Sequence, residues 1–491
     1  MAITIDDPTT LRVLSVASEM FPLVKTGGLA DVTGALPAAL APQGVHVQTL
    51  LPGYPAVLQA LSQAERIAVW PDHFGGSARL LQGRLDGLDI LALDAPHLYA
   101  RDGNPYLGPD GRDWPDNGER FAALSLAAAR IGWGDTPVPA PQVVHAHDWQ
   151  AALAAAYLHY LSRDRPRPRT VLTVHNLAFQ GRFDRRLFGL LGLPAQAYTS
   201  EGLEYHGDVG FLKAGLLLAD AITTVSPSYA DEIRTPHGGM GLDGILRWRA
   251  EAVSGIVNGI DTEVWNPATD THLARRYSAA TAADRIHNRR AVERHFGLPP
   301  DDNSLLLCVI SRLTDQKGID LVIDALDPLV HAGARLVVLG SGDRAFESQL
   351  KAAAVHYPAK VGVQIGYDEP LSHLMQGGCD AILVPSRFEP CGLTQLCGLR
   401  YGCVPIVARV GGLADTVIDA NDAALRAGVA TGLQLTSVSH EGLMAAVRKA
   451  VHLYAEGAPW QRLQQAGMTG DVGWSASAAR YAALYRQLLA V

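Results

Sequence analysis

The chain has 491 residues and a formal net charge of −8 at pH 7; 48% of its residues are hydrophobic and 18% are charged. This length exceeds what one hydrophobic core usually serves, so two domains are expected, and the composition is globular rather than disordered or fibrous. The acidic balance argues against nucleic acid as the main partner, because phosphate backbones are bound by basic surfaces.

No window approaches 18 consecutive apolar residues, so no membrane-spanning helix is expected. The segment from Met1 to Thr10 holds two Asp and no basic residue, which differs from a signal peptide. An odd number of cysteines without a secretory signal favours reduced thiols in the cytoplasm. These cysteines are Cys308, Cys379, Cys391, Cys397 and Cys403.

Short runs rich in Leu and Val alternate with longer amphipathic stretches along the chain. Leu11 to Ala17 predicts a buried strand, and Gly28 to Leu40 predicts the helix that follows it. The same cycle predicts strands at 45–51, 143–147, 171–175, 221–225, 305–310, 336–339, 381–384 and 404–408. This alternation predicts an α/β protein with doubly wound parallel sheets. Ligands bind beyond the carboxyl ends of the strands in such sheets.

The hydrophobic pattern is weakest at 248–256 and again at 270–303, where Pro, Asp and Thr gather. We therefore predict one Rossmann-like domain over residues 1–254 and a second over 255–473, with an excursion at 262–300. Trp474 to Leu489 has the apolar spacing of a final helix within the last segment, 474–491.

A Gly-Gly pair opens a predicted helix in each half of the chain. Gly27-Gly28 is followed by Leu-Ala-Asp31-Val, and Gly411-Gly412 is followed by Leu-Ala-Asp-Thr. Glycine lets a backbone approach a ligand closely, and the free N–H groups of a helix start attract an anion. Two related nucleotide-type domains facing one another across a cleft would explain this repeat. Chance similarity of two helix starts is the alternative.

Cations stand beside two predicted helix starts. Lys25 lies just before Gly27, which suits a diphosphate or a sugar that bears one, although a surface Lys at a turn is the alternative. Arg312 and Lys317 follow the strand predicted at 305–310. An Arg fork and a Lys point charge at the end of a central strand can converge on one diphosphate. The alternative is a solvated helix start.

The segment from Phe388 to Thr394 follows the strand predicted at 381–384 and opens a helix. An anion is expected to face the backbone N–H groups of Gly392, Leu393 and Thr394. Glu389 would lie at the mouth of that site, where sugar hydroxyls can solvate its carboxylate. Cys391 is interpreted as a packed thiol, because no His lies at a spacing that suggests activation.

The sequence His145-Ala-His147-Asp148 invites a metal interpretation. We expect the two histidines on opposite faces of the strand, so that only His147 and Asp148 share a site. No further His or carboxylate ligands cluster nearby, and no metal is expected. His175 ends the next strand and predicts a polar pocket, with a core histidine bonded to backbone as the alternative. For Asn258, which lies in the predicted linker turn, turn chemistry alone is an alternative.

Motifs of other enzyme classes are missing: no G-x-G-x-x-G follows a strand, no G-x-S-x-G accompanies a triad, and there is no Walker A sequence. The motifs resemble instead the bacterial and plastid glycogen and starch synthases, family 5 of the retaining glycosyltransferases. The resemblance covers nearly the whole chain, with matches at 18–22, 25–32, 145–149, 173–180, 211–215, 224–227, 258–261, 311–318, 364–367, 385–396 and 411–417. One departure is Val410, where the family usually has Thr.

The resemblance implies a GT-B architecture, with the donor mostly on the C-terminal domain, the acceptor mostly on the N-terminal domain, and a final helix that crosses back to the first domain. It implies transfer of glucose from ADP-glucose to glycogen or a malto-oligosaccharide, in the cytoplasm, without metal or other cofactor. UDP-glucose as the donor, a glucan phosphorylase and a glucan-binding protein without catalysis are the alternatives.

Matched motif by motif, the resemblance also implies roles for the candidate residues. Arg312 and Lys317 would neutralise the departing diphosphate, and Glu389 would hold glucose hydroxyls. His175 would lie against the anomeric carbon, and Asp148 would bind the sugar. The remaining substrate-binding set is Lys25, Gly27, Gly28, Asp31, Asn258, Tyr367 as the platform for the base, Cys391, Gly392, Leu393 and Thr394.

Cleavage of a glycosyl–phosphate bond produces an oxocarbenium-like sugar and a diphosphate anion. Fixed positive charge near the leaving oxygen is therefore expected to contribute most to catalysis. No pair of carboxylates at glycosidase spacing is evident, which favours transfer over hydrolysis. Front-face attack with the departing phosphate as the base is favoured, and a double displacement through Glu389 stays open.

Overall fold

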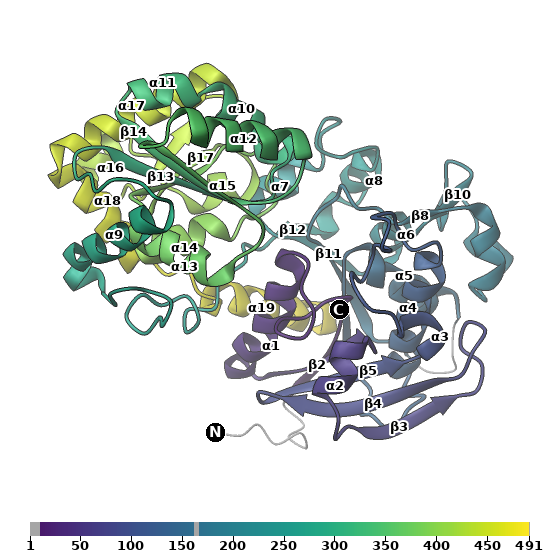
Figure 1. Cartoon of the computed structure of the whole chain (residues 1–491). Coiled ribbons are helices and arrows are strands. Elements are labelled where there is room, and N and C mark those ends of the chain that lie inside the picture. Colours follow the sequence, from purple (N-terminus) through teal and green to yellow (C-terminus); the bar gives the residue numbers. More distant parts are fainter. Residues whose placement is uncertain (1–9, 162–165, 491) are drawn as a thin grey trace. The chain divides into compact units, whose positions relative to one another are not determined.

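The computed structural model describes residues 10–161 and 166–490 (Figure 1). The chain forms two compact units, one of Met1–Asn258 with Trp474–Val491 and the other of Gly259–Gly473. The segment from Met1 to Thr10, which differs from a signal peptide in sequence, lies outside the described residues except for Thr10. Among the described helices, none is both long and apolar enough to cross a membrane.

The first unit is built on a nine-stranded sheet in the order β12-β11-β7-β6-β1-β2-β5-β4-β3. Its strands are β1 (Leu11–Val16), β2 (Val45–Pro52), β3 (Glu65–Trp70), β4 (Ala78–Leu85), β5 (Leu88–Asp94), β6 (Val143–His147), β7 (Arg169–Val174), β11 (Ala221–Thr224) and β12 (Val253–Gly255). Neighbours from β12 to β5 are parallel.

The first sheet is antiparallel at one edge, formed by residues over which no strand was predicted. β3 pairs antiparallel with β4, and β4 pairs antiparallel with β5. Asp86 and Gly87 both have positive φ and form the tight turn between β4 and β5. An Asp-Gly turn between two alternating runs is a hairpin signal, so this edge was open to prediction from the sequence.

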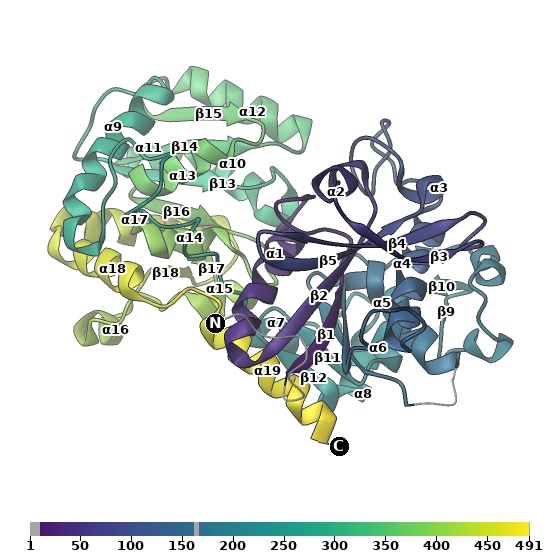
Figure 2. The same cartoon turned by 90° about the horizontal axis from the view of Figure 1, so that it is seen from below.

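Different helices cover the two faces of the first sheet. Leu14, Val144 and Leu172 pack on one face with α4 (Asn117–Gly132), α5 (Asp148–Tyr160) and α6 (Phe211–Leu218). On the other face Val13, Val143 and Val171 pack with α1 (Gly28–Leu40) and α19 (Ser475–Ala490). Figure 2 shows α19, in yellow, beside α1. Trp474, Ala478, Tyr481, Ala482 and Tyr485 form the buried stripe that holds α19 there.

Short elements complete the first unit. Its other helices are α2 (Pro55–Ala60), α3 (Pro96–Tyr99), α7 (Pro227–Glu232) and α8 (Asp243–Trp248). A small antiparallel sheet has the order β8-β10-β9, with β8 at Arg182–Phe183, β9 at Glu204–Tyr205 and β10 at Asp208–Gly210.

The second unit has a six-stranded parallel sheet in the order β15-β14-β13-β16-β17-β18. Its strands are β13 (Leu305–Ile310), β14 (Ala334–Gly340), β15 (Val361–Ile365), β16 (Ala381–Val384), β17 (Val404–Ala408) and β18 (Leu433–Leu435). The helices are α9 (Arg285–His295), α10 (Ile319–Asp324), α11 (Leu326–His331), α12 (Arg344–His356), α13 (Glu369–Gly378), α14 (Thr394–Tyr401), α15 (Gly411–Thr416), α16 (Asp422–Ala427), α17 (His440–Glu456) and α18 (Ala458–Thr469). Separate apolar cores lie on the two faces of the sheet.

The division between the units falls after Asn258, four residues beyond the boundary predicted near Ser254. β12 explains the difference, because Ser254 and Gly255 pair with β11 and so belong to the first sheet. The chain returns to the first unit at Trp474.

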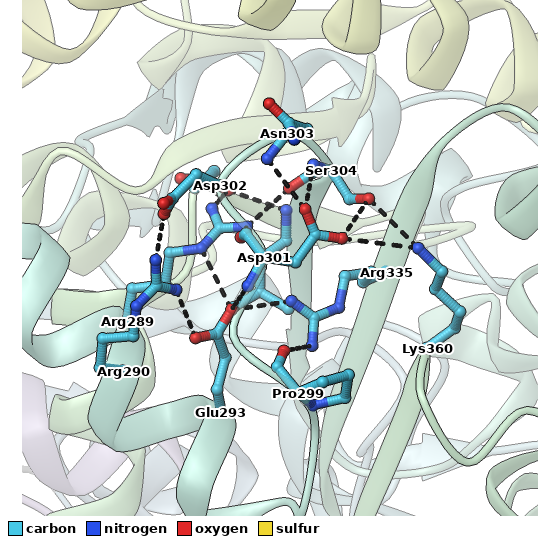
Figure 3. A network of polar contacts seen from close by, with 12 residues as sticks. Arg289, Arg290, Glu293, Pro299, Asp301, Asp302, Asn303, Ser304, Arg335 and Lys360 are labelled. Carbon is cyan, nitrogen blue, oxygen red and sulfur yellow. Dashed lines mark hydrogen bonds and ion pairs between the residues drawn. The ribbon is translucent and has the colours of Figure 1, made fainter.

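The segment predicted as an excursion contains α9, and a buried network of ion pairs fixes it to the second sheet (Figure 3). Arg335 on β14 donates to Glu293 at 2.7 Å, and Arg289 lies 3.4 Å from the same oxygen. Arg289 also pairs with Asp380, which stands just before β16. Removal of one partner would leave an uncompensated buried charge, so this network holds α9 in one place.

Candidate functional site

The candidate residues lie in both units, and the loop between β1 and α1 carries the first of them. Lys25 Nζ lies 2.7 Å from Asp31 Oδ1, and both side chains are about one-third exposed. The buried carboxylate of Glu19 accepts hydrogen bonds from the backbone N–H and, at 2.7 Å, from the hydroxyl of Thr26. The hydroxyl of Tyr106 also donates to Glu19. Glu19 therefore fixes the loop that presents Lys25, a role that the sequence did not indicate.

Gly27 differs from most glycines of the chain in what surrounds it. Gly27 is extended, with φ −161° and ψ −166°, and caps α1, which begins at Gly28. A Cβ on Gly27 would meet no atom within 4 Å. Neither backbone strain nor packing therefore requires glycine at position 27, which leaves close approach by a ligand as a reason for it.

The side chains of His145, His147 and His175 lie in a row across two neighbouring strand ends. The rings of His145 and His147 are 4.2 Å apart between centroids, and His147 Nδ1 lies 3.0 Å from His175 Nε2. The expectation that His145 and His147 point to opposite faces was wrong, because residues two apart in a strand share a face. Burial lowers the pKa of His145 and that of His175 to about 3, so both rings are neutral at physiological pH.

Asp148 lies at the start of α5 with a positive φ of 55°, which is uncommon for a residue with a side chain. Its carboxylate accepts a hydrogen bond of 2.7 Å from the backbone N–H of His175. Burial raises the pKa of Asp148 to about 7, against the opposing effect of the backbone hydrogen bonds from His175 and Asn176. Asp148 thus holds the loop after β7.

Within residues 10–161 and 166–490, no group of three or more His, Cys, Asp or Glu side chains is arranged to hold a metal ion. The two nitrogens of His147 face the Ser15 hydroxyl at 3.2 Å and the ring of His175 at 3.0 Å.

In the second unit, Lys317 and Glu389 meet although 72 residues separate them in sequence. Lys317 Nζ lies 2.5 Å from Glu389 Oε2, and the same oxygen accepts a hydrogen bond of 3.0 Å from Ser386. Glu389 is 7% exposed. The pair forms because β13 and β16 are neighbours, so the loops after them share one edge of the sheet.

Arg312 is exposed and lies on the same loop as Lys317. Its guanidinium donates to Gln316 Oε1 at 3.0 Å, and Gln316 Nε2 donates to the carbonyl of Phe388 at 3.2 Å. Gln316 therefore links the loop after β13 to the segment that carries Glu389. Sequence reasoning brought Arg312, Lys317 and Glu389 to one sheet edge but missed Gln316 and Ser386, which orient them.

The Gly411-Gly412 pair is packed, unlike Gly27. The N–H of Gly412 donates to the carbonyls of Glu389 and Pro390, both at 3.1 Å. A Cβ on Gly411 would lie 2.1 Å from the Glu389 carbonyl oxygen, and one on Gly412 would lie 2.3 Å from that of Cys391. The expectation that both pairs direct N–H groups at an anion was therefore wrong for Gly412. Here glycine allows α15 to support the Glu389 segment.

The helix start after Glu389 presents donors. α14 begins at Thr394, and the first N–H groups of a helix have no acceptor within it. Among the described residues, none accepts a hydrogen bond from the N–H of Gly392, Leu393 or Thr394. Gly392, at φ 72°, turns the chain into the helix. Cys391 is 5% exposed, and its carbonyl accepts a hydrogen bond of 3.1 Å from Gln395, which fits a structural residue.

Two candidates stand apart from these clusters. Tyr367 follows β15 and is 75% exposed, with its hydroxyl bonded to Glu369. Asn258 ends the first unit and is buried, and no described residue donates a hydrogen bond to its Oδ1. A buried oxygen without a donor is costly unless a ligand or water supplies one.

Both units match models of known protein families. Residues 12–248 match the model of the starch synthase catalytic domain, and residues 292–462 match that of the group 1 glycosyl transferases. A glycogen synthase of Rhodopseudomonas palustris (strain BisA53) is 57% identical over 480 residues, with 98% of each chain covered. One of Rhizobium johnstonii is also 57% identical, over 98% of this chain and 99% of the relative.

The chain belongs to the glycogen synthase family. Its structure is similar to that of the catalytic domain of starch synthase IV from Arabidopsis thaliana bound to ADP and acarbose, with a TM-score of 0.86 and 30% identity over 98% of this chain and 100% of that one. A sucrose-phosphate synthase of Thermosynechococcus elongatus, at 18% identity and a TM-score of 0.59, shares the fold. Membership of the glycogen synthase family makes the chain a glucosyltransferase with the two Rossmann-like domains of the GT-B fold.

Proposed function

We propose that the chain transfers glucose from ADP-glucose to the non-reducing end of an α-1,4-glucan, with retention of configuration and release of ADP. The second unit binds the donor and the first unit binds the acceptor. The Arabidopsis relative, solved with ADP and acarbose, supports the choice of nucleotide and of a glucan-like acceptor. The five cysteines are buried thiols, which supports a reaction in the cytoplasm.

The observation that carries the proposal is the contact between Lys317 and Glu389 at the carboxyl ends of β13 and β16. Lys317 and Arg312 place positive charge where the diphosphate leaves, and the N–H groups at the start of α14 add donors for the same anion. Tyr367 stacks on the base. No metal is required, because these side chains neutralise the leaving group.

Glu389 orients the glucose and stabilises positive charge on its ring in this proposal. Its Oε2 already accepts from Lys317 and Ser386, and both bonds draw electron density from the carboxylate. Such a carboxylate is a poor nucleophile, which favours front-face attack over a covalent glycosyl-enzyme. The departing phosphate then takes the proton of the acceptor hydroxyl.

The first unit contributes His175 beside the anomeric carbon. Asp148 binds the sugar and also holds the loop after β7. Lys25, with Gly27, Gly28 and Asp31, lies against the donor, and the Oδ1 of Asn258 accepts from a sugar hydroxyl. The unpartnered buried oxygen of Asn258 and the open space around Gly27 support these assignments.

The test is to incubate the purified chain with ADP-glucose or with UDP-glucose and a malto-oligosaccharide primer, and to measure nucleotide release and primer elongation. We expect both products with ADP-glucose and a clearly lower kcat/KM with UDP-glucose. Equal or reversed specificity constants would refute the choice of donor. Nucleotide release without elongation would refute the transfer.

A further inference from the structure

One face of the first sheet changes from apolar to polar toward the carboxyl ends of its strands. Val13, Val143 and Val171 belong to the apolar core on that face. Two residues further along the same strands stand the buried side chains of Ser15, His145 and Thr173. His145 bonds to Thr173, and Ser15 bonds to His147 at the end of β6, so the sheet carries a buried polar layer that reaches His175 through His147.

Within this layer, Ser15, His147 and His175 form a continuous row. Ser15 Oγ lies 3.2 Å from His147 Nε2, and His147 Nδ1 lies 3.0 Å from His175 Nε2. Ser15 is 5% exposed and His147 is 0% exposed. Each contact needs one proton, and a neutral imidazole carries only one N–H, so the row has two consistent arrangements.

In one arrangement His175 donates to His147, and His147 donates from Nε2 to Ser15. The hydroxyl proton of Ser15 would then have no acceptor among the described residues, and a buried unsatisfied donor is costly. In the other arrangement the Ser15 hydroxyl donates to His147 Nε2, and His147 donates from Nδ1 to His175 Nε2. Both contacts of the row then have a donor and an acceptor, and the one N–H left over, on Nδ1, belongs to the partly exposed His175.

We infer that Ser15 and His147 fix the tautomer of His175, so that its Nε2 accepts from His147 and its Nδ1 carries the proton. Ser15 and His147 are thus positioning residues for His175. This inference rests on the proposed function only for its consequence: at the reacting sugar, His175 offers an N–H donor and not a basic nitrogen. It can donate to a sugar oxygen, whereas the proton of the acceptor hydroxyl goes to the departing phosphate.

A second set of contacts in the same layer provides a matched control. The Tyr485 hydroxyl of α19 lies 2.8 Å from His145 Nδ1, and His145 Nε2 lies 2.5 Å from Thr173 Oγ1. Tyr485 is fully buried, as Ser15 nearly is. Tyr485→Phe therefore removes one buried hydroxyl bonded to a histidine of β6, as Ser15→Ala does, but leaves the row to His175 complete.

The direct test is the proton position on His175 in the full-length chain labelled with ¹⁵N-histidine. Two-bond ¹H–¹⁵N correlations distinguish a protonated from a bare ring nitrogen, and the signals of His175 are assigned by their loss in His175→Gln. We expect the proton on Nδ1. A proton on Nε2 would overturn the inference. This measurement needs no substrate, so it stands even if the proposed donor or acceptor is wrong.

Kinetics test the consequence. We expect Ser15→Ala to lower kcat roughly tenfold, the scale of one lost hydrogen bond, with little change in the KM of the donor. Ser15→Thr, which keeps the hydroxyl, should restore most of kcat and the Nδ1 proton. Tyr485→Phe should lower the melting temperature as much as Ser15→Ala but keep kcat within about twofold. Equal losses of kcat in Ser15→Ala and Tyr485→Phe, or an unchanged tautomer in Ser15→Ala, would refute the role of Ser15.

Discussion

Lys317 and Glu389 are opposite charges in contact, and Glu389 is nearly buried. A partly desolvated ion pair is sensitive to the loss of one partner, because the other charge is then uncompensated. The proposed reaction adds a second demand on Lys317, since the diphosphate gains negative charge as the bond to glucose breaks. The same cation therefore serves both the carboxylate and the leaving group.

We expect Lys317→Ala to cost about 3 kcal/mol in the transition state, a loss of ~10²–10³ in kcat with a smaller rise in KM. Steady-state kinetics with the preferred donor provide the measurement. Lys360 also pairs with a carboxylate of the second unit, Asp301 at 3.5 Å, and Lys360→Ala is the control that should leave kcat near the parent value.

Glu389→Gln separates charge from shape at the same contact. The amide keeps the size of the side chain and one hydrogen-bond acceptor but removes the negative charge. If the carboxylate stabilises a positively charged sugar ring, kcat should fall nearly as far as in Glu389→Ala. Near-normal kcat in Glu389→Gln would show that Glu389 only orients glucose. Values within twofold of the parent for Lys317→Ala, Arg312→Ala and Glu389→Ala would remove the site assignment.

Asp148 makes the stability of the folded chain depend on pH with a sign opposite to that of most carboxylates. Burial raises its pKa to about 7, whereas an unfolded Asp titrates near 3.8. Between these values the folded state holds a proton that the unfolded state has released, so stability falls as pH rises from about 4 to about 7.

We expect Asp148→Asn to gain stability over the parent through this window, by up to about 1.4 kcal/mol per pH unit. Asn also tolerates the positive φ of this position. The measurement is the melting temperature of both proteins at pH 5, 6, 7 and 8. The buried histidines titrate in both proteins and cancel in the difference. A difference that is constant from pH 5 to pH 7 would contradict the raised pKa.

The sequence predicted which residue types stand at strand ends, but not their partners. Lys317 and Glu389 were both found because each follows an apolar run. Their contact depends on β13 and β16 being neighbours, which one sequence does not specify. The Ser15–His147–His175 row depends in the same way on the order β1-β6-β7.

Helix starts are the elements on which the proposed site is built, and the two Gly-Gly pairs show that similar sequences are used differently. α1 was predicted with its observed bounds, because Gly28 to Leu40 has a clear apolar period. The role of Gly412 could not be predicted, because it follows from the packing of α15 against the Glu389 segment.

We expect Gly27→Ala and Gly412→Ala to have different effects on stability and activity. Gly27 has open space around its Cβ position and an extended backbone, so Gly27→Ala should keep the melting temperature while it weakens donor binding. Gly412→Ala places a methyl group 2.3 Å from the Cys391 carbonyl oxygen and should lower both stability and kcat.

Thermal melting and the KM of the donor distinguish the two variants. Gly244→Ala is the control, because its Cβ also meets no atom within 4 Å and the proposed function gives it no role. Gly27→Ala with normal KM would show that no ligand approaches this backbone, and the assignment of Lys25 would lose its support.

At the scale of the whole chain, the alternation of strands and helices predicted two α/β domains. It gave no strands over residues 65–94, although the Asp86-Gly87 turn there is a hairpin signal that the search for alternating strands and helices passed over. The polar network around α9 could not be predicted from the sequence for another reason. Its partners come from α9, β14 and the turn before β16, and each charge looks solvated when the segment is taken alone.

The proposed chemistry needs no metal, and we expect kcat to persist in excess chelator. Arg312 and Lys317 supply the positive charge that a divalent ion would otherwise bring to the diphosphate. The measurement is nucleotide release with and without EDTA, after dialysis against it. Loss of activity on chelation, restored by one divalent ion, would bring forward His147 and Asp148 as ligands. Metal binding there would require His147 to give up its contact with Ser15 or with His175, and Asp148 to give up its bond to the His175 backbone. Removal of the metal in the same experiment would then also change the proton position on His175.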